Sequence, residues 1–421
     1  EQLHFCFSYS DGRRELAPAT LIDRVKTLFP GCHEQPAATF LSSGGTLQSE
    51  QSGFSFLLQS LDGEGALHDA LRAHYADHPL YREKLARANA LFHAPAARHT
   101  LGPSLAKKLY GNTLITTVSR LMTYRECPFR HFAQYGLQAL PRPEFKEKRA
   151  DIGSFSHMAL EAFVREMDLR ALSYAAITPD EIDLLLDDIL EDCLARYKDG
   201  LLLATPRMRM LSKFFMQAVR DTAHRLVASI QAGSFLPILT EARFGKDAPL
   251  PPVDLPLQNG RAALSGVIDR VDAATVDGRL LLRVVDYKTG DANLRYGELA
   301  DGLALQLPIY LKAAEAMEGS TPAGMFYQPV REAVAEEEDE EKSAAALRMQ
   351  GILVEDQAAI DATEYALLGQ SQVMARLQKK ADGSCGGSAG LIEEDDMRLL
   401  LDFAVKRAGE IAEDLLSGRV D

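Results

Sequence analysis

The sequence predicts an α/β protein in which helices flank a central mixed sheet, with a mainly helical region in front of it. Two observations lead to this prediction. Long helical patterns are followed by three segments with the apolar or alternating pattern of strands. A further helix, two strands and a final helix come next, and this order of elements is typical of an α/β core.

The core elements follow one another along the chain. Helical patterns cover 153–167 and 179–231, and the second is broken around Gly200 and Pro206. Asp277-Gly278 is a hairpin signal between two of the strand patterns. The strands are expected at 238–244, 262–273, 280–287, 323–330 and 350–354, and the last two helices at 303–317 and 397–416.

The first 110 residues have a different pattern from the core. The expected elements are a short strand at 3–8, a turn at Asp11-Gly12, a helix at 18–29 and helices within 52–109. Because a strand standing alone cannot bury its faces, we expect the chain to begin partway through a longer polypeptide. We place the main domain boundary near Gly111, before a short strand at Ile115 and a helix capped by Ser119.

Composition limits the class of protein. Hydrophobic residues make up 46% and charged residues 25% of the 421 residues, which indicates a folded chain. No stretch approaches the roughly 20 apolar residues of a membrane span, and the N-terminus lacks a signal-peptide pattern, so we expect a cytoplasmic protein. An odd number of scattered cysteines argues against a disulfide framework; they are Cys6, Cys32, Cys127, Cys193 and Cys385.

The charge is unevenly distributed. A net charge of -14 argues at first against a nucleic-acid partner, but two acidic runs at 336–341 and 393–396, which we interpret as solvated loops, supply most of the excess. Two segments are locally basic, so an anionic ligand is compatible with the sequence. The basic residues are Arg120, Arg125, Arg130, Arg142, Lys146, Lys148 and Arg149 in the first, and Arg207, Arg209, Lys213, Arg220 and Arg225 in the second.

Carboxylates recur inside two otherwise apolar strands. Asp269 and Asp286 lie near the apolar centre of the expected hairpin, and burying an unpaired carboxylate is costly. The strand period places Asp286 and Lys288 on one face. These groups could hold an oxygen-coordinated Mg²⁺ or Mn²⁺ and orient a water for attack on a phosphate. The alternative is a structural salt bridge at a sheet end, because D-x-K alone is common.

Two helices offer further candidates. His157 stands one turn into a helix that begins near Gly153, and an imidazole is a credible ligand for a hydrolytic metal, although a lone histidine is more often a core or capping residue. Gln306 and Tyr310 stand at i and i+4 shortly after the D-x-K strand. They could contact a substrate, although each alone would be an ordinary helix residue.

Four motifs occur in a fixed order. They are G-x-x-x-H ending at His157, G-x-I-D-R-x-D at 266–272, D-Y-K-T-G at 286–290 and Q-x-x-x-Y at 306–310. Together they resemble the RecB-type nuclease family of the PD-(D/E)XK superfamily, over about 113–421. The block at 118–132 and the opening at 3–21 are similar to the AddB subunits of bacterial AddAB helicase-nucleases, whose nuclease region follows an inactive helicase-like region. The resemblance thus implies 1–110 as the end of that region with a helical linker, and 111–421 as the nuclease domain.

The resemblance implies a restriction-endonuclease-like core and a role for each motif residue. His157, Asp269, Asp286 and the Tyr287 carbonyl would bind Mg²⁺ or Mn²⁺, and Lys288 would activate or position the water. Gln306 and Tyr310 would support the site and the DNA strand. The implied activity is exonucleolytic phosphodiester hydrolysis in double-strand break repair and recombination. The implied partners are single-stranded DNA ends produced by unwinding and the helicase-nuclease A subunit.

One cysteine departs from the family pattern. In the family, the equivalent of Cys127 joins a C-x-x-C-x5-C triplet near the C-terminus to hold a 4Fe-4S cluster. No such triplet precedes Asp421, and neither Cys193 nor Cys385 is a convincing substitute. We therefore predict no cluster in this chain, either because the sequence stops before the triplet or because the lineage lost it. The alternative role for Cys127 is that of a buried cysteine.

Two other functions are considered. A stand-alone CRISPR-associated RecB-like exonuclease is generally shorter and lacks the helicase-like leader. A catalytically inactive scaffold for DNA binding or subunit docking is expected to lose at least one motif residue, and none is lost here. Arg207, Arg209 and Lys213 are candidates for a strand-guiding surface, with a solvated helix face as the alternative. Arg270 is expected to pair with acidic neighbours, and Glu241 to form a surface pair rather than extend the metal site.

Overall fold

The computed structural model describes most of the chain in two units. The described residues are 5–9, 17–34, 36, 47, 49–93, 100–111, 113–139, 149–258, 260–290, 293–331, 347–385 and 390–421, without the side chains of 149–152. The compact units are Glu1–Ala97 and Arg98–Asp421, and each is described by itself. Within these ranges no helix combines the length and the apolar character that a membrane span requires.

The first unit is helical in its described part. Its helices are α1 (Thr20–Leu28), α3 (Glu50–Gln59), α4 (Ala66–Asp77) and α5 (Arg82–Phe92). A small core joins the last three helices, and its buried residues are Phe54, Leu57, Tyr75 and Leu85. The helix expected at 18–29 is confirmed by α1. The strand expected at 3–8 is wrong for residues 5–8, since the described part of this unit offers no partner strand, and the turn at Asp11-Gly12 lies outside the described residues.

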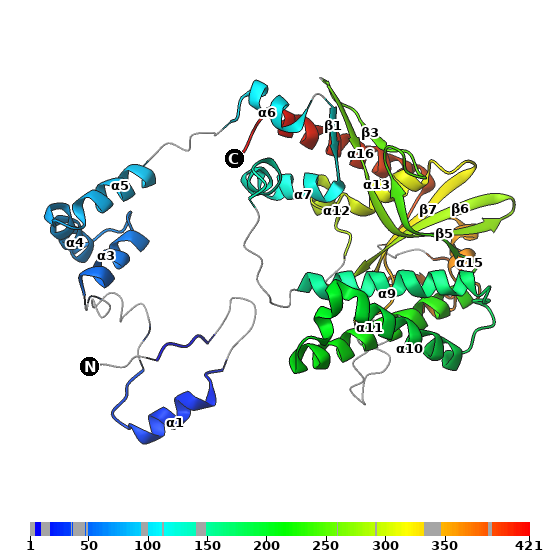
Figure 1. The fold of residues 1–421 in the computed structure, drawn as a ribbon, viewed down its shortest axis with the longest axis horizontal. Coiled ribbons are helices and arrows are strands. Elements are labelled where there is room, and N and C mark those ends of the chain that lie inside the picture. Colours follow the sequence, from blue (N-terminus) through cyan, green and yellow to red (C-terminus); the bar gives the residue numbers. More distant parts are fainter. Residues whose placement is uncertain are drawn as a thin grey trace. The chain divides into compact units, whose positions relative to one another are not determined.

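The second unit is built on a central mixed sheet, as the sequence predicts, and this sheet has six strands (Figure 1). The strand order is β11-β8-β7-β6-β5-β2, with parallel pairing of β6 with β7 and of β8 with β11 and antiparallel pairing elsewhere. The strands are β2 (Leu236–Phe244), β5 (Gly266–Val276), β6 (Arg279–Lys288), β7 (Ser320–Pro329), β8 (Gln350–Val354) and β11 (Leu391–Ile392).

One expected strand is divided between two sheets. The pattern at 262–273 breaks at Ser265, whose backbone N–H donates to the Thr116 carbonyl at 2.9 Å. The part before the break pairs with strands of a small second sheet, and the part after it is β5. The small sheet consists of β1 (Thr113–Thr116), β4 (Arg261–Leu264) and β3 (Val253–Leu255), and a separate pair consists of β9 (Gly369–Gln370) and β10 (Gln378–Lys379).

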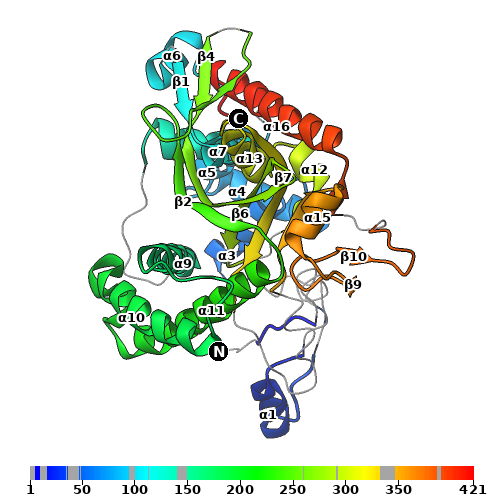
Figure 2. The same cartoon turned by 90° about the vertical axis from the view of Figure 1, so that its right-hand side faces the viewer.

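Helices cover both faces of the main sheet (Figures 1 and 2). Val284 packs in the cluster of α7, α13 and α16, whereas its neighbour Val285 points to the other face, which α15 covers in part. On that face α9 contacts β2 and β6, and α10 and α11 pack against α9. The helices are α7 (Val118–Glu126), α8 (Pro128–His131), α9 (Arg149–Leu169), α10 (Pro179–Arg196), α11 (Pro206–Gln231), α12 (Tyr296–Ala300), α13 (Gln306–Ala314), α15 (Gln357–Thr363) and α16 (Glu394–Leu416).

The second unit starts earlier than the boundary expected near Gly111. Helix α6 (Pro103–Tyr110) contacts α16, and a β-bridge joins Thr100 with Arg419 near the end of the chain. The helix before Gly111 therefore packs as part of the sheet-containing unit.

The second acidic run is not a loop. Glu393 is the N-cap of α16, and the next three acids form the first turn of that helix. The partial positive charge of a helix N-terminus stabilises carboxylates in the first turn. The prediction of a solvated loop did not take this stabilisation into account. The first run, at 336–341, lies outside the described residues.

Candidate active site

The hairpin of β5 and β6 places Asp269 and Asp286 side by side at one end of the main sheet. Arg270 pairs with Val285, so the next residues outward, Asp269 and Asp286, lie opposite each other on one face. Asp269 is held from the neighbouring strand, because the backbone N–H of Tyr287 donates to its Oδ2 at 2.8 Å.

His157 reaches the same place from α9. Its Nε2 donates to the Tyr287 carbonyl at 2.9 Å, and its Nδ1 lies 3.3 Å from Asp269 Oδ2. Burial lowers the pKa of His157, but the hydrogen bond and the charge of Asp269 outweigh burial and raise it overall. The imidazole, the carboxylate and the carbonyl therefore face one another, although they come from residues 130 positions apart.

A second set of polar contacts surrounds Asp286. Lys288 Nζ lies 2.6 Å from Asp286 Oδ2, as the strand period predicts, and donates to Gln306 Oε1 at 3.0 Å. The amide of Gln306 donates to Asp286 Oδ1 at 2.7 Å and lies 3.1 Å from the Tyr310 hydroxyl. The N-terminal turn of α13 thus fixes the positions of both the carboxylate and the ammonium group.

The contacts of Asp286 do not fully offset the cost of burying its charge. Its side chain is 1% exposed, and burial together with the nearby charge of Asp269 raises its pKa to about 6, although Lys288 opposes the shift. A buried carboxylate that resists ionisation beside a second carboxylate is the arrangement that an added cation would stabilise.

Glu241 joins this group against expectation. It lies on β2 between Thr240, which pairs with Arg270, and Ala242, which pairs with Ile268, so it is next to Asp269. Donor atoms of His157, Glu241 and Asp269 lie within 4.8 Å of one another, and Glu241 forms no ion pair with any described residue. Burial, with the charges of Asp269 and Glu161, raises its pKa to about 7. The expected surface pair is therefore wrong, because strand register turns this carboxylate toward Asp269.

A cavity of about 580 Å³ gives access to these groups. Its lining includes His157, Glu161, Glu241, Asp269 and Lys288. Glu161 stands one helical turn after His157 on α9, and that i+4 spacing was the available sequence signal for it. Asp286, Gln306 and Tyr310 are not among the lining residues, so Gln306 and Tyr310 act on the site through the contacts of Gln306 with Asp286 and Lys288.

The middle of the same hairpin holds a fully buried ion network. Asp272 accepts hydrogen bonds from Arg270 Nε at 2.8 Å and from Arg283 Nε at 2.9 Å, as the expected pairing of Arg270 with acids requires. Arg270 also donates to the Tyr287 hydroxyl at 2.8 Å. The Arg283 guanidinium lies 4.4 Å from the centre of the Phe235 ring, a cation–π distance. The network therefore holds the side chain of Tyr287, whose backbone contacts Asp269 and His157.

The basic residues of α11 lie apart from these contacts. Arg207, Arg209 and Lys213 are exposed on its first turns, and none lines the cavity. Arg209 donates to the Leu203 carbonyl at 2.8 Å. Farther along, Arg220 forms ion pairs with Asp183 and Asp187 of α10, so part of this basic segment is structural.

The earlier basic segment is also engaged in local contacts. The Arg120 guanidinium lies 4.8 Å from the centre of the Tyr135 ring, and Arg130 pairs with Glu126 at 2.9 Å. Arg142, Lys146, Lys148 and the side chain of Arg149 lie outside the described residues.

Cys127 is a half-buried helix cap. Its Sγ accepts from the Arg130 backbone N–H at 3.4 Å at the start of α8. All five cysteines are free. Helix α7, which ends just before Cys127, packs on α16, and the Tyr124 hydroxyl donates to the Arg419 carbonyl at 3.2 Å. Cys127 thus follows a helix that is anchored to the last helix of the described chain.

Comparison with known proteins identifies the family. Residues 116–387 match the family described as the PD-(D/E)XK nuclease superfamily. A protein of Symbiobacterium thermophilum, by its name the B subunit of an ATP-dependent helicase/deoxyribonuclease, is 33% identical over 96% of this chain and 37% of its own length. Its namesake in Moorella thermoacetica is 32% identical over 97% of this chain and 37% of its own length.

The chain therefore spans a little over a third of the length of these relatives. The matched region contains the hairpin, His157 and the start of α13 that together build the site. The agreement of motif order, mixed sheet and family match leads to one conclusion: this chain belongs to the PD-(D/E)XK nuclease superfamily.

Proposed function

We propose that this chain is the metal-dependent DNA nuclease region of the AddB-type subunit of a helicase-nuclease, and that it hydrolyses phosphodiester bonds as an exonuclease. The observation that carries the proposal is the convergence of His157, Asp269 and Lys288 on one cavity, with Asp286 buried beside Asp269 and paired with Lys288. The names of the relatives support the assignment to a helicase-nuclease complex.

The donor groups fit a divalent cation. Carboxylate and carbonyl oxygens are the ligands of Mg²⁺ and Mn²⁺, and an imidazole is compatible with Mn²⁺. The raised pKa of Asp286 supports the fit, since burial and the nearby charge of Asp269 disfavour its ionised form more than Lys288 and His157 favour it. His157, Asp269, Asp286 and the Tyr287 carbonyl would hold the ion. When bound, it would stabilise charge developing on the phosphate and lower the pKa of a water.

The remaining residues have positioning roles in this proposal. The Lys288 ammonium would donate to the attacking water or to a phosphate oxygen, and its contact with Gln306 keeps it directed there. Gln306 would fix the orientation of Asp286, and Tyr310 would fix that of Gln306. Exposed Arg207, Arg209 and Lys213 would guide the strand; neutralising all three together should then weaken single-strand binding and flatten its salt dependence.

The proposal extends to partners and setting. The substrate would be single-stranded DNA ends produced by unwinding, supplied by a helicase-nuclease A subunit during double-strand break repair and recombination in the cytoplasm. The residues before about 111 would form the end of an inactive helicase-like region and a linker, with α6 at the end of the linker packed on α16 of the nuclease unit. This chain would hold no 4Fe-4S cluster on Cys127, and stoichiometric iron and sulfide in the purified chain would contradict that expectation.

The test is cleavage of end-labelled single-stranded DNA with Mg²⁺ or Mn²⁺. Asp286→Ala and Lys288→Ala are each expected to abolish cutting, because they remove a proposed ligand and the water-positioning cation. The matched controls are Asp254→Ala on β3 and Lys406→Ala on α16, both exposed and outside the cavity. Undiminished cutting by Asp286→Ala would refute the site. A parent chain that binds DNA but neither cuts it nor binds metal would favour the scaffold function.

A further inference from the structure

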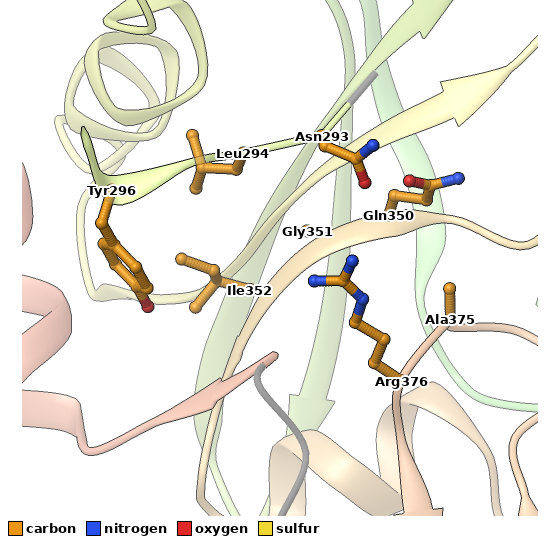
Figure 3. Close-up of a pocket in the computed structure, with 8 residues that line it drawn as sticks. All are labelled: Asn293, Leu294, Tyr296, Gln350, Gly351, Ile352, Ala375 and Arg376. Carbon is orange, nitrogen blue, oxygen red and sulfur yellow. The ribbon is translucent and has the colours of Figure 1, made fainter. Parts of the chain in front are cut away.

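A second, small pocket has no role in the chemistry described so far. It is formed by the loop after β6, by β8 and by residues 375–376 (Figure 3). Figure 3 shows the polar side chains of Asn293, Gln350 and Arg376 gathered at one end, around Gly351. Leu294, Tyr296 and Ile352 form an apolar wall at the other end.

Strand register connects this pocket to Asp286. Asp286 pairs with Tyr327 on β7, and Tyr327 pairs with Gln350 on β8. Paired residues on neighbouring strands point to the same face of a sheet, so the three side chains form one row. Two strand spacings separate Asp286 from Gln350, or about 10 Å. A DNA strand with a phosphate at Asp286 reaches the pocket within a few nucleotides, because stacked nucleotides advance about 3.4 Å each.

The charge of the pocket suits an anion. One arginine and no acid are among the residues that line it, in a chain with a net charge of -14. Across the described part of the chain, the side chains of Asn293, Gln350 and Arg376 have no hydrogen-bond or ion-pair partner. Three groups able to donate hydrogen bonds therefore converge without a protein acceptor.

Arg376 is held in an unusual backbone conformation. Its φ is +66°, in the left-handed region that non-glycine residues rarely adopt. The residues before Arg376 are hydrogen-bonded to Met349, which directly precedes β8. Ala375 N–H donates to the Met349 carbonyl at 2.8 Å, and Met349 N–H donates to the Val373 carbonyl at 3.0 Å. Backbone strain of this kind concentrates at binding sites, where the surrounding structure maintains it.

We propose that this pocket is a subsite for one nucleotide of the substrate strand, a few linkages from the bond that is cut. Its enclosed part is small, about 30 Å³, so it takes phosphate oxygens rather than a whole base. Arg376, Asn293 and Gln350 hold the phosphate, and the sugar and base of the same nucleotide pack on Tyr296 and Leu294. The position relative to the cut rests on the nuclease function proposed above.

The first test measures binding of a fluorescent oligothymidylate in the presence of a chelator, so that no cutting occurs. Arg376→Ala is expected to weaken binding about three- to ten-fold and to lower the slope of log K against log salt by about 0.7, the value for one phosphate contact on a single strand. Tyr296→Ala is expected to weaken binding with an unchanged slope. Arg261→Ala, which removes an exposed arginine on β4, is the matched control and should change affinity little.

The second test places one uncharged methylphosphonate at each linkage of the oligonucleotide in turn. At one linkage it should weaken binding by the parent and by Arg261→Ala but not by Arg376→Ala, because the charge pair is already absent in that variant. Equal effects on the parent and on Arg376→Ala at every linkage would overturn the subsite.

With Mg²⁺ or Mn²⁺ added, the sensitive linkage should lie within a few nucleotides of the cut, and a distant linkage would overturn its placement. A parent that neither cuts DNA nor binds metal would refute the nuclease function, while the binding comparison would still decide whether the pocket holds a phosphate.

Discussion

The β5–β6 hairpin carries two charged clusters with opposite balances. In its middle, Asp272 stands between Arg270 and Arg283, all three fully buried. At its end, Lys288 pairs with Asp286, and the neighbouring Asp269 lies 3.3 Å from His157. Although burial alone would raise the pKa of Asp272, its two arginines lower it, whereas the pKa of Asp286 is raised to about 6.

The difference separates a structural network from a binding site. Both clusters have the same signature in the sequence, a carboxylate within an apolar strand. In the first, the protein supplies every counter-charge that the carboxylate needs. In the second, the protein leaves negative charge uncompensated next to a cavity. The sign of the carboxylate's pKa shift therefore distinguishes the two better than burial does, since both aspartates are almost fully buried.

The largest effect on stability is expected from Asp272→Asn. It leaves two buried arginines without a counter-charge, which typically costs about 3–5 kcal/mol of the free energy of unfolding. Urea denaturation measures this loss. The exposed Asp254→Asn should change stability by less than about 0.5 kcal/mol. A loss no larger than that of the control would mean that the buried network is not a structural requirement.

A smaller and pH-dependent effect is expected from Asp286→Asn. Because the folded pKa lies above the ordinary value of 3.8, Asp286 contributes stability that is present below about pH 4 and lost as the pH rises through 6. Between pH 4 and pH 7 the metal-free parent should lose about 2 kcal/mol relative to Asp286→Asn, which cannot ionise.

Denaturation at several pH values, with and without Mn²⁺, tests this expectation. Mn²⁺ should stabilise the parent more at pH 7 than at pH 5, since protons compete for the ligands, and should not stabilise the variant comparably. If the free energy of unfolding of the parent and of the variant changed equally with pH in the absence of metal, the proposed difference between the Asp272 and Asp286 clusters would be contradicted.

The smallest effect is expected from Tyr287→Phe, which cuts the connection between the clusters. The variant loses the hydrogen bond from Arg270, worth about 1–2 kcal/mol. It should also bind Mn²⁺ a few-fold more weakly in calorimetry, because the backbone at 287 contacts both Asp269 and His157. Tyr174→Phe is the matched control, because the Tyr174 hydroxyl is buried without a hydrogen-bond partner among the described residues. Unchanged metal affinity would show that the network acts on stability alone.

Local patterns predicted much of the fold. The strand expected at 350–354 matches β8 residue for residue, and Asp277-Gly278 forms the expected hairpin turn. These features depend on residues close in sequence, whose alternation and turn chemistry are visible in one segment. The period of a strand likewise fixes Asp286 and Lys288 on one face without reference to the rest of the chain.

Features that depend on register between distant segments were not predictable. Glu241 contacts the site because β2 pairs antiparallel with β5, and nothing near Glu241 in the sequence specifies that pairing. The break at Ser265 similarly depends on the Thr116 carbonyl, 149 positions away. Arg376 and Asn293 meet at one pocket only because two loops approach β8. In each case tertiary contacts, rather than local propensity, decide the position.

The backbone of Glu241 has a consequence for redesign. Its φ is +46°, a conformation that glycine adopts at little cost and that glutamate adopts only under constraint. A stability-guided redesign would therefore select Glu241→Gly, since removing backbone strain and a half-buried carboxylate both favour the folded state. The same change would delete an acid that lies within 4.8 Å of donor atoms on His157 and Asp269. Thermostabilised versions of this domain should keep the glutamate and seek their added stability at positions outside the cavity.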